Sequence, residues 1–297
     1  MALSRMAQMT TAVVIDRLRR QLRAAETATG LPECPTLTLG IPPIDGILGG
    51  GLGRGALHEI AAIRESETAA ATGFALALAA RAALASEASG QRGHSISARA
   101  GHSPEPGSSA RNARSAMAGR SLFWIAEDLS LAENGAPYGP GLDEAGIAPE
   151  HVITVAAARS RDVLWAMEEA LRCRAVGVAI GELRARDIDQ VASRRLSLAA
   201  AAGNTLGLIL RTAPDDAPSA AATRWIVGAA PFPAEGDERF HGIGPPRFIA
   251  HLIRNRRGHL GAWIVEWNSV EQRFELATHS QPVAGAAVDR PHRAAVA

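Results

Sequence analysis

The side chains of this 297-residue chain that could carry out chemistry are few and far apart. Two carboxylates, Glu127 in LFWIAED and Glu182 in VAIGEL, stand at the ends of predicted strands, where ordinary solvated acids are common. The nine histidines are scattered, and Cys34 and Cys173 have the spacing of neither a metal site nor a disulfide framework. The sequence therefore predicts no metal site.

The segment that says most about chemistry follows a strand predicted over residues 56–62. An ATPase carries GxxxxGK[ST] at such a place, because backbone amides and the lysine hold phosphates while the hydroxyl holds magnesium. This chain has AAIRESETAAATGF, in which Glu65 and Glu67 would repel phosphate oxygens. All 31 basic residues are arginines, so no lysine can come from elsewhere in the chain. Arg64 could replace the cation, but a loop without glycines cannot wrap around phosphates, so we expect no conventional ATP hydrolysis and no cofactor.

Strands and helices alternate through most of the chain. Besides residues 56–62, the patterns predict strands over 122–126, 152–156, 175–180 and 205–211, and helices over 69–84, 160–174 and 187–202. This alternation predicts an α/β fold with a mostly parallel central sheet and helices on both faces. Three later strands, over 224–228, 247–256 and 262–267, have no helices between them, which predicts an antiparallel C-terminal edge.

Composition divides the chain into a core with extensions. We predict an N-terminal helix and linker over 1–35, a core over 36–278, and a flexible tail over 279–297. Residues 86–120 are rich in Ser, Gly, Ala and Arg with few large apolar side chains, so they cannot bury enough surface to offset their ordering entropy. We therefore expect this segment to be a disordered insertion within the core.

The overall charge and hydropathy exclude several classes of protein. Hydrophobic residues make up 47% of the chain and the net charge is only +1, so a large core is expected and no global field favours nucleic acid or membrane. No apolar run approaches the roughly 20 residues of a membrane span. The first residues lack a signal-peptide pattern, and the cysteines indicate a reducing compartment. We expect a cytoplasmic protein.

The segment LTLGIPPIDGILGGGLGRGALHEI resembles the entry to the RecA core. Ten residues stand in the matching places: Leu39, Gly40, Ile44, Asp45, Leu48, Gly50, Gly51, Leu52, Gly55 and Glu59. The resemblance covers roughly residues 10–270 and implies a RecA-like core. It also implies that Glu127 matches the residue that activates the attacking water, and that Glu182 lies near the magnesium-binding acid, although Gly181 is the alternative match. These two carboxylates would then be relict ATPase positions.

A second resemblance extends over several segments: YGPGLDEAGI, LWAMEEALRCRAVGVAIGEL and ASRRLSLAAAAGNTLGLILR, together with the missing phosphate loop. These segments resemble the ImuA family, the RecA-like partner proteins of bacterial mutagenesis cassettes, a family also described as similar to the division inhibitor SulA. The resemblance implies a damage-induced role in error-prone translesion synthesis. It also implies two partners, ImuB (an inactive Y-family polymerase homologue) and an error-prone replicative-type polymerase.

One candidate binding surface lies near the N-terminus. Val14, Leu18 and Leu22 form an apolar stripe at helical spacing within a predicted helix over 11–27, and arginines surround them. By resemblance to RecA, where this helix docks on a neighbouring subunit, the stripe could dock on RecA or on a second copy of this protein. Packing on the chain's own core is the alternative.

A second candidate surface is the segment RFIAHLIRNRRGHLGAW. Four of its arginines could contact single-stranded DNA: Arg247, Arg254, Arg256 and Arg257. Arginine binds phosphates well, and Trp263 and Trp267 nearby could stack on unpaired bases. Since alternation places about half of a strand's side chains in the core, packing is the more common role of such tryptophans. Tyr138, the only tyrosine, marks a fixed turn.

These observations favour a non-catalytic RecA-like adaptor in SOS-induced error-prone translesion synthesis. It would act through contacts with RecA and/or the mutagenic polymerase partners. Two alternatives stay open: an atypical ATPase that uses Arg64 as its cation, and a SulA-like inhibitor of cell division.

Overall fold

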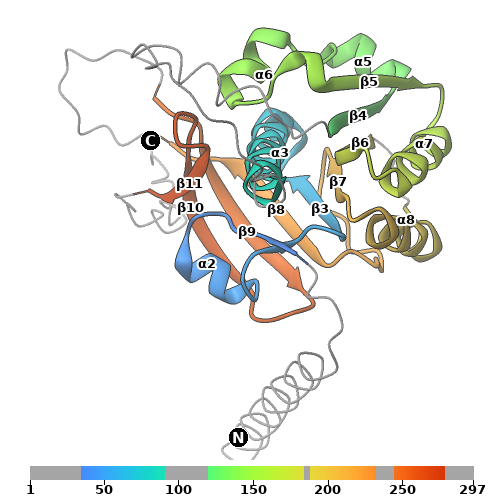
Figure 1. Ribbon diagram of the computed structural model, residues 1–297. Helices are drawn as coiled ribbons and strands as arrows, with labels where there is room; N and C mark the ends of the chain where they lie inside the picture. The colour runs from blue at the N-terminus through green and yellow to red at the C-terminus, as the bar shows by residue number, and fades with distance from the viewer. Residues whose placement is uncertain (1–34, 91–119, 184–187, 232–243, 278–297) are drawn as a thin grey trace, which may run out of the picture. The chain divides into compact units, whose positions relative to one another are not determined.

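The computed structural model describes residues 35–90, 120–183, 188–231 and 244–277, and its main feature is a nine-stranded sheet (Figure 1). In spatial order the strands are β11, β10, β9, β8, β3, β7, β6, β4 and β5. Their bounds are β3 Leu57–Ala62, β4 Ser121–Glu127, β5 Val152–Ala157, β6 Val176–Leu183, β7 Leu206–Arg211, β8 Thr223–Ala229, β9 Arg247–Asn255, β10 Gly261–Asn268 and β11 Arg273–Leu276.

Within the run from β8 to β5 in this order, each strand is parallel to the next. Every residue of β3, β6 and β7 is buried, as expected for central parallel strands covered on both faces. Alternate residues belong to two separate cores. Val178 and Ile180 of β6 pack into one core, while Ala179 and Leu183 pack into the other.

Helices cover the two faces of the sheet (Figure 1). The helices α3 (Thr68–Gly90), α2 (Pro42–Ile47) and α6 (Gly139–Ala145) contribute to the larger core. The helices α7 (Ser160–Arg172) and α8 (Gln190–Gly203) contribute to the core on the other face. A further short helix, α5 (Asp128–Asn134), follows β4 directly. The predicted α/β class, with a mostly parallel sheet, helices on both faces and an antiparallel C-terminal edge, is confirmed.

The antiparallel edge differs from the prediction in two respects. We expected the strand over residues 224–228 to belong to it, but β8 is parallel to β3 and antiparallel only to β9. A fourth strand, β11, was not predicted; its four residues are too few for an alternating pattern, although Phe274 is fully buried. The physical reason for the first error is that β8 pairs with β3 across more than 150 residues, which a local pattern does not reveal.

The helix α3 also extends beyond its predicted end. It continues to Gly90, so the first five residues of the predicted insertion, 86–90, are helical. At the other end, the Arg120 side chain donates hydrogen bonds to the carbonyls of Arg174 and Gly203, at 2.8 and 3.3 Å. Residues 91–119, the N-terminal helix and the predicted tail from 279 onward lie outside the described residues.

The glycine-rich segment before β3 builds a turn rather than a ligand loop. Gly49, Gly50 and Gly51 all have positive φ, and a Cβ at Gly51 would collide with the backbone of Leu37. This close approach pairs β1 (Thr36–Leu37) with β2 (Leu52–Gly53). The glycines are therefore used on the N-terminal side of β3, whereas a phosphate-binding loop would need them after it.

Candidate functional site

The loop between β3 and α3 is short and hydrogen-bonded to the neighbouring strand β8. It contains Ile63, Arg64 and a 3-10 turn over Glu65–Glu67. The Arg64 guanidinium donates to Glu67 Oε1 through Nε at 3.0 Å and Nη2 at 2.5 Å. Glu67 Oε2 accepts the backbone N–H of Ala229 at 2.9 Å, and the N–H of Ile63 donates to the carbonyl of Val227 at 2.8 Å.

These bonds determine what the loop can bind. The hydrogen bond from Arg64, followed by that from the Ala229 N–H, lowers the pKa of Glu67, so this side chain is a carboxylate at neutral pH. Arg64 is engaged with that carboxylate. A Cβ at Gly228 would collide with Glu67, which shows how closely the loop approaches β8. The loop thus presents negative charge where a phosphate-binding loop would present amides and a lysine.

Glu127 and Glu182 end up on opposite faces of the sheet. Glu127 is the last residue of β4. Its carboxylate accepts a hydrogen bond at 2.5 Å from the hydroxyl of Ser160, the first residue of α7. Glu182 lies in β6 beside Ala126 of β4, and it follows the alternation of Val178 and Ile180, whose side chains pack on the α3 face. The two predicted relict positions are close in the sheet, but each has its own hydrogen-bond partners.

The predicted arginine cluster is divided by the structure. Arg247 is buried at one end of β9, where it forms an ion pair with Glu266 (Nε–Oε2, 3.3 Å) and donates to the Pro231 carbonyl at 3.1 Å. Arg254, Arg256 and Arg257 lie at the other end, at and after the end of β9, roughly 25 Å away at about 3.4 Å per residue. Burial, followed by the charge of Arg256, lowers the pKa of Arg254. DNA contact stays a prediction for these three arginines.

The two tryptophans of this segment pack against other aromatic rings of the protein. The rings of Trp267 and Phe274 meet edge to face with centroids 5.0 Å apart, and Trp267 is buried. Trp263 packs against Trp225, with centroids 6.2 Å apart. Both therefore serve the core, as the packing interpretation predicts. Val14, Leu18 and Leu22 lie outside the described residues, so their docking also stays a prediction.

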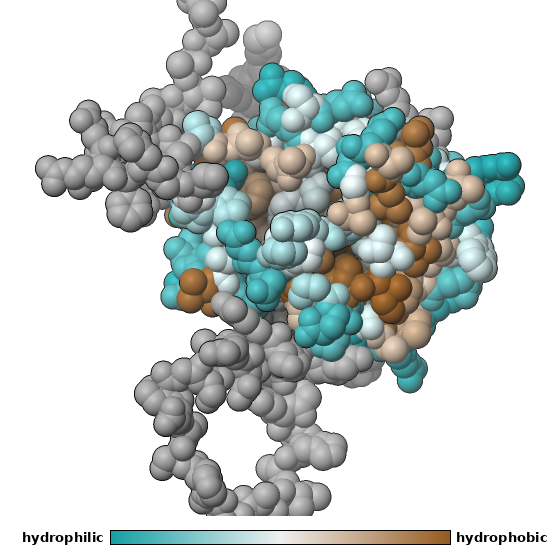
Figure 2. Space-filling model, turned by 90° about the horizontal axis from the view of Figure 1, so that it is seen from above, coloured by the Kyte–Doolittle hydropathy of each residue, from teal (hydrophilic) through white to brown (hydrophobic). Residues whose placement is uncertain are grey.

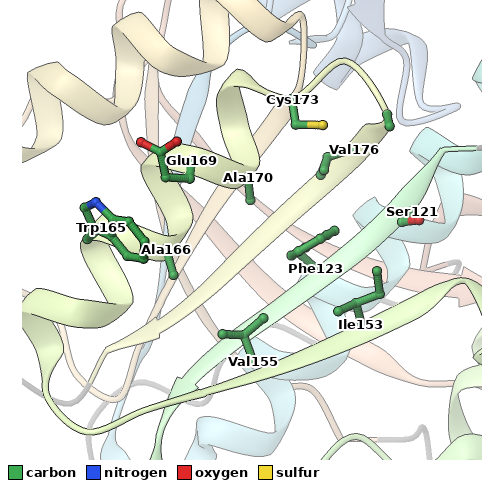
Figure 3. A pocket seen from close by; sticks show the side chains of 11 residues that line it. Ser121, Phe123, Ile153, Val155, Trp165, Ala166, Glu169, Ala170, Cys173 and Val176 are labelled. Carbon is green, nitrogen blue, oxygen red and sulfur yellow. The ribbon is translucent and has the colours of Figure 1, made fainter.

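An apolar groove that the sequence analysis missed lies between α7 and the edge strand β5 (Figure 3). We call it the edge groove; its volume is about 440 Å³. Ile153 is 44% exposed and Trp165 is 64% exposed beside it. The residues that line it are Ser121, Phe123, Ile153, Val155, Trp165, Ala166, Glu169, Ala170, Cys173, Ala175 and Val176. In a view from above, hydrophobic residues gather on the side of the molecule that carries α7 and β5 (Figure 2).

The backbone next to the edge groove is also unpaired on one side. Among the described residues, β5 forms a ladder with β4 alone, so its outer N–H and C=O groups face no strand. The sequence signal for this groove is Trp165. Trp165 lies off the buried stripe of α7, and together with Ile153 it forms exposed apolar surface beside the groove. The buried residues of α7 are Val163, Met167, Glu168, Ala170 and Leu171.

The described ranges contain neither a candidate metal site nor a candidate membrane-spanning helix. There, no three His, Cys, Asp or Glu residues come together in a way that could hold a metal ion. A search of the helices in the same ranges finds none whose length and hydropathy would let it span a membrane.

Comparison with known proteins agrees with the resemblance noted in the sequence. The chain is 29% identical over 253 residues to Protein ImuA from two strains of Caulobacter vibrioides, which covers 81% of this chain and 86% of those proteins. The predicted similarity to ImuA is thus confirmed. No family model matches the chain. Among solved structures, the RadB recombinase is similar with a TM-score of 0.47 and 13% identity, covering 82% of this chain and 100% of that chain.

Proposed function

We propose that this protein is a non-catalytic, RecA-like adaptor in SOS-induced, error-prone translesion DNA synthesis. Its similarity to Protein ImuA supports the setting. The observation that carries the non-catalytic part is the β3–α3 loop. Arg64, the one cation in that loop, is paired with Glu67, and Glu67 accepts a hydrogen bond from β8, so the loop holds a carboxylate beside its single basic side chain and disfavours phosphates.

The adaptor acts through contacts with RecA and/or the mutagenic polymerase partners, an ImuB-type Y-family homologue and an error-prone replicative-type polymerase. The edge groove is the described surface best suited to such a contact. Exposed apolar surface next to a strand edge that no described strand pairs with favours an extended segment of the partner that adds a strand to β5. A helix laid in the groove would cover Ile153 and Trp165 but leave the outer amides of β5 unpaired.

Binding to RecA, free and filamented on single-stranded DNA, tests this proposal in biolayer interferometry. We expect saturable binding that the substitution Ile153→Arg abolishes, because a charge in the groove cannot be desolvated without a partner. Val270→Arg is the control, since Val270 is also an exposed aliphatic residue (92% exposed) but lies in the turn after β10. ImuB and the polymerase are tested in the same way.

One result would narrow the proposal, and another would overturn it. Binding that Ile153→Arg and Val270→Arg weaken equally would remove the edge groove from it. Saturable binding of ATP with magnesium, followed by its hydrolysis, would contradict the non-catalytic role and favour the atypical ATPase.

A further inference from the structure

Three glutamates are buried among the described residues, and one of them lacks a cationic partner there. Glu59 accepts a hydrogen bond from Arg224 Nε at 2.7 Å, and Glu168 forms ion pairs with Arg172 and Arg195. Glu182, only 6% exposed, accepts hydrogen bonds from the Ser130 hydroxyl and from Asn134 Nδ2 at 3.4 Å. Both of these bonds go to Oε1.

A buried carboxylate without an opposite charge is costly, since hydrogen bonds replace only part of its hydration. The chain balances the charge of Glu59 and Glu168 with guanidinium groups. For Glu182 the described residues leave this role open, and they leave Oε2 without a hydrogen bond. The question is therefore whether a ligand can reach it.

Glu182 lines a pocket on the α3 face of the sheet, which we call the Glu182 pocket. Its volume is about 500 Å³, within the range of small-molecule sites. Apolar walls come from Leu76 of α3, Trp124 of β4 and Leu142 of α6. Tyr138, which is 74% exposed, also lines the pocket and offers an aromatic ring that a ligand can contact.

We propose that the Glu182 pocket binds an organic cation, namely an amidinium or guanidinium group on an apolar body. Glu182 Oε2 accepts the N–H groups of the cation, while Ser130 and Asn134 hold Oε1 in place. Trp124 and Leu142 cover the apolar body, and Tyr138 adds a cation–π contact. A phosphate-bearing ligand is disfavoured, because Glu182 would repel it.

The proposal is independent of partner docking, because the edge groove lies on the α7 face. The same chemistry could come from a free small molecule or from an arginine side chain of a protein. Isothermal titration of the full chain with two probes distinguishes these sources: benzamidinium, and an Ala-Arg-Ala peptide blocked at both ends. Benzamide, which has the same shape as benzamidinium without its charge, is the ligand control.

We expect saturable binding of a cationic probe that Glu182→Gln weakens about tenfold or more, since a charge-assisted hydrogen bond is lost while the side-chain shape is kept. Glu169→Gln is the matched control and should leave the affinity unchanged, because Glu169 lines the edge groove instead. Preference for benzamidinium would assign the site to a small molecule, and preference for the peptide would assign it to an arginine side chain.

Three results would overturn the proposal: no saturable binding of either cation, equal binding of benzamide, or an unchanged affinity in Glu182→Gln. If circular dichroism shows that this variant does not fold, Tyr138→Ala provides the test. Tyr138 is exposed, so the variant should fold, and its affinity for the cation should fall about threefold. An unchanged affinity would likewise overturn the proposal.

Discussion

The centre of the sheet and its β5 edge both depart from the usual distribution of polar and apolar residues, in opposite directions. Between β3 and β8, the neighbouring pairs His58–Thr223 and Glu59–Arg224 bury polar side chains. At the β5 edge, Ile153 and Trp165 expose apolar ones. The buried polar side chains at the centre have their hydrogen-bonding partners in the chain. The apolar side chains at the β5 edge are left uncovered by the described residues.

Most polar atoms of the buried side chains at the centre of the sheet have a hydrogen-bond partner. Arg224 donates to Glu59 and to the carbonyls of Asp215 and Ala217, at 2.7, 2.7 and 2.9 Å. His58 contacts Thr223 Oγ1 at 2.8 Å through Nδ1 and donates to the Gly53 carbonyl at 2.9 Å through Nε2. Unusual burial therefore indicates a structural role here, whereas incomplete partnering at the edge indicates a binding role. The following predictions test that distinction.

The largest effect is expected from breaking the central ion pair. Glu59→Gln should lower the free energy of unfolding by about 3–5 kcal/mol, because Arg224 would stay buried without its carboxylate. Urea unfolding measures the change. Glu169→Gln, at an exposed position, should change it by less than about 0.5 kcal/mol. Equal losses in the two variants would contradict the structural role of the centre.

Acid should also weaken the centre. Burial lowers the pKa of His58 to about 4, so between about pH 6.5 and 4 the unfolded chain binds more protons at this residue than the folded chain. Stability should therefore fall as the pH falls through this range, by roughly 3 kcal/mol in total from His58. This component should disappear in His58→Gln and persist in His259→Gln, as measured by urea unfolding at several pH values. The same pH dependence in both variants would refute it.

A smaller effect, on binding alone, is expected at the edge. Trp165→Ala should weaken binding of the partner to the edge groove by about 2 kcal/mol. This is a roughly thirtyfold loss of affinity, as is typical of a tryptophan at the centre of an interface. The free energy of unfolding of the Trp165→Ala variant should stay within about 0.5 kcal/mol of that of the unchanged protein. A large loss of stability without a loss of binding would reverse our assignment of the two regions.

The smallest effect is expected in the β3–α3 loop. Arg64→Ala removes an exposed ion pair, so we expect no measurable shift of the thermal unfolding midpoint. Titration with ATP and magnesium should give no binding before or after the change. If the original chain bound ATP and the variant did not, Arg64 would be the cation of an atypical nucleotide site.

Local patterns were sufficient for most elements of the fold. The strand predicted over 56–62 and the helix predicted over 160–174 lie within two residues of β3 and α7, because buried strands and amphipathic helices have distinct periods. The pairing of β8 with β3 could not be predicted in this way, since it joins segments more than 150 residues apart. The helical end of α3 was missed because Ala, Ser and Gly at 85–90 give no hydrophobic period.

The candidate site was harder to predict than the fold. The absence of a phosphate loop followed from the composition of AAIRESETAAATGF, because Lys and Gly are required there by chemistry. The hydrogen bonds that Glu67 accepts, from the Ala229 N–H of β8 and from Arg64, required the structure. So did the edge groove, since β5 becomes an edge only through the strand order. Glu182 was selected as a relict position, but only the structure shows that no described residue supplies a cation to pair with it.

The edge position of strand β5 also determines how this protein should be handled. In the part of the chain that the structure describes, the outer amides of β5 face no strand and lie beside apolar side chains, which makes this edge a template for association between copies. We expect light scattering by the isolated chain to rise with concentration and to fall when Ile153 is replaced by arginine. Dilute samples, or co-expression with a segment that covers β5, are therefore the practical route to crystals and spectra.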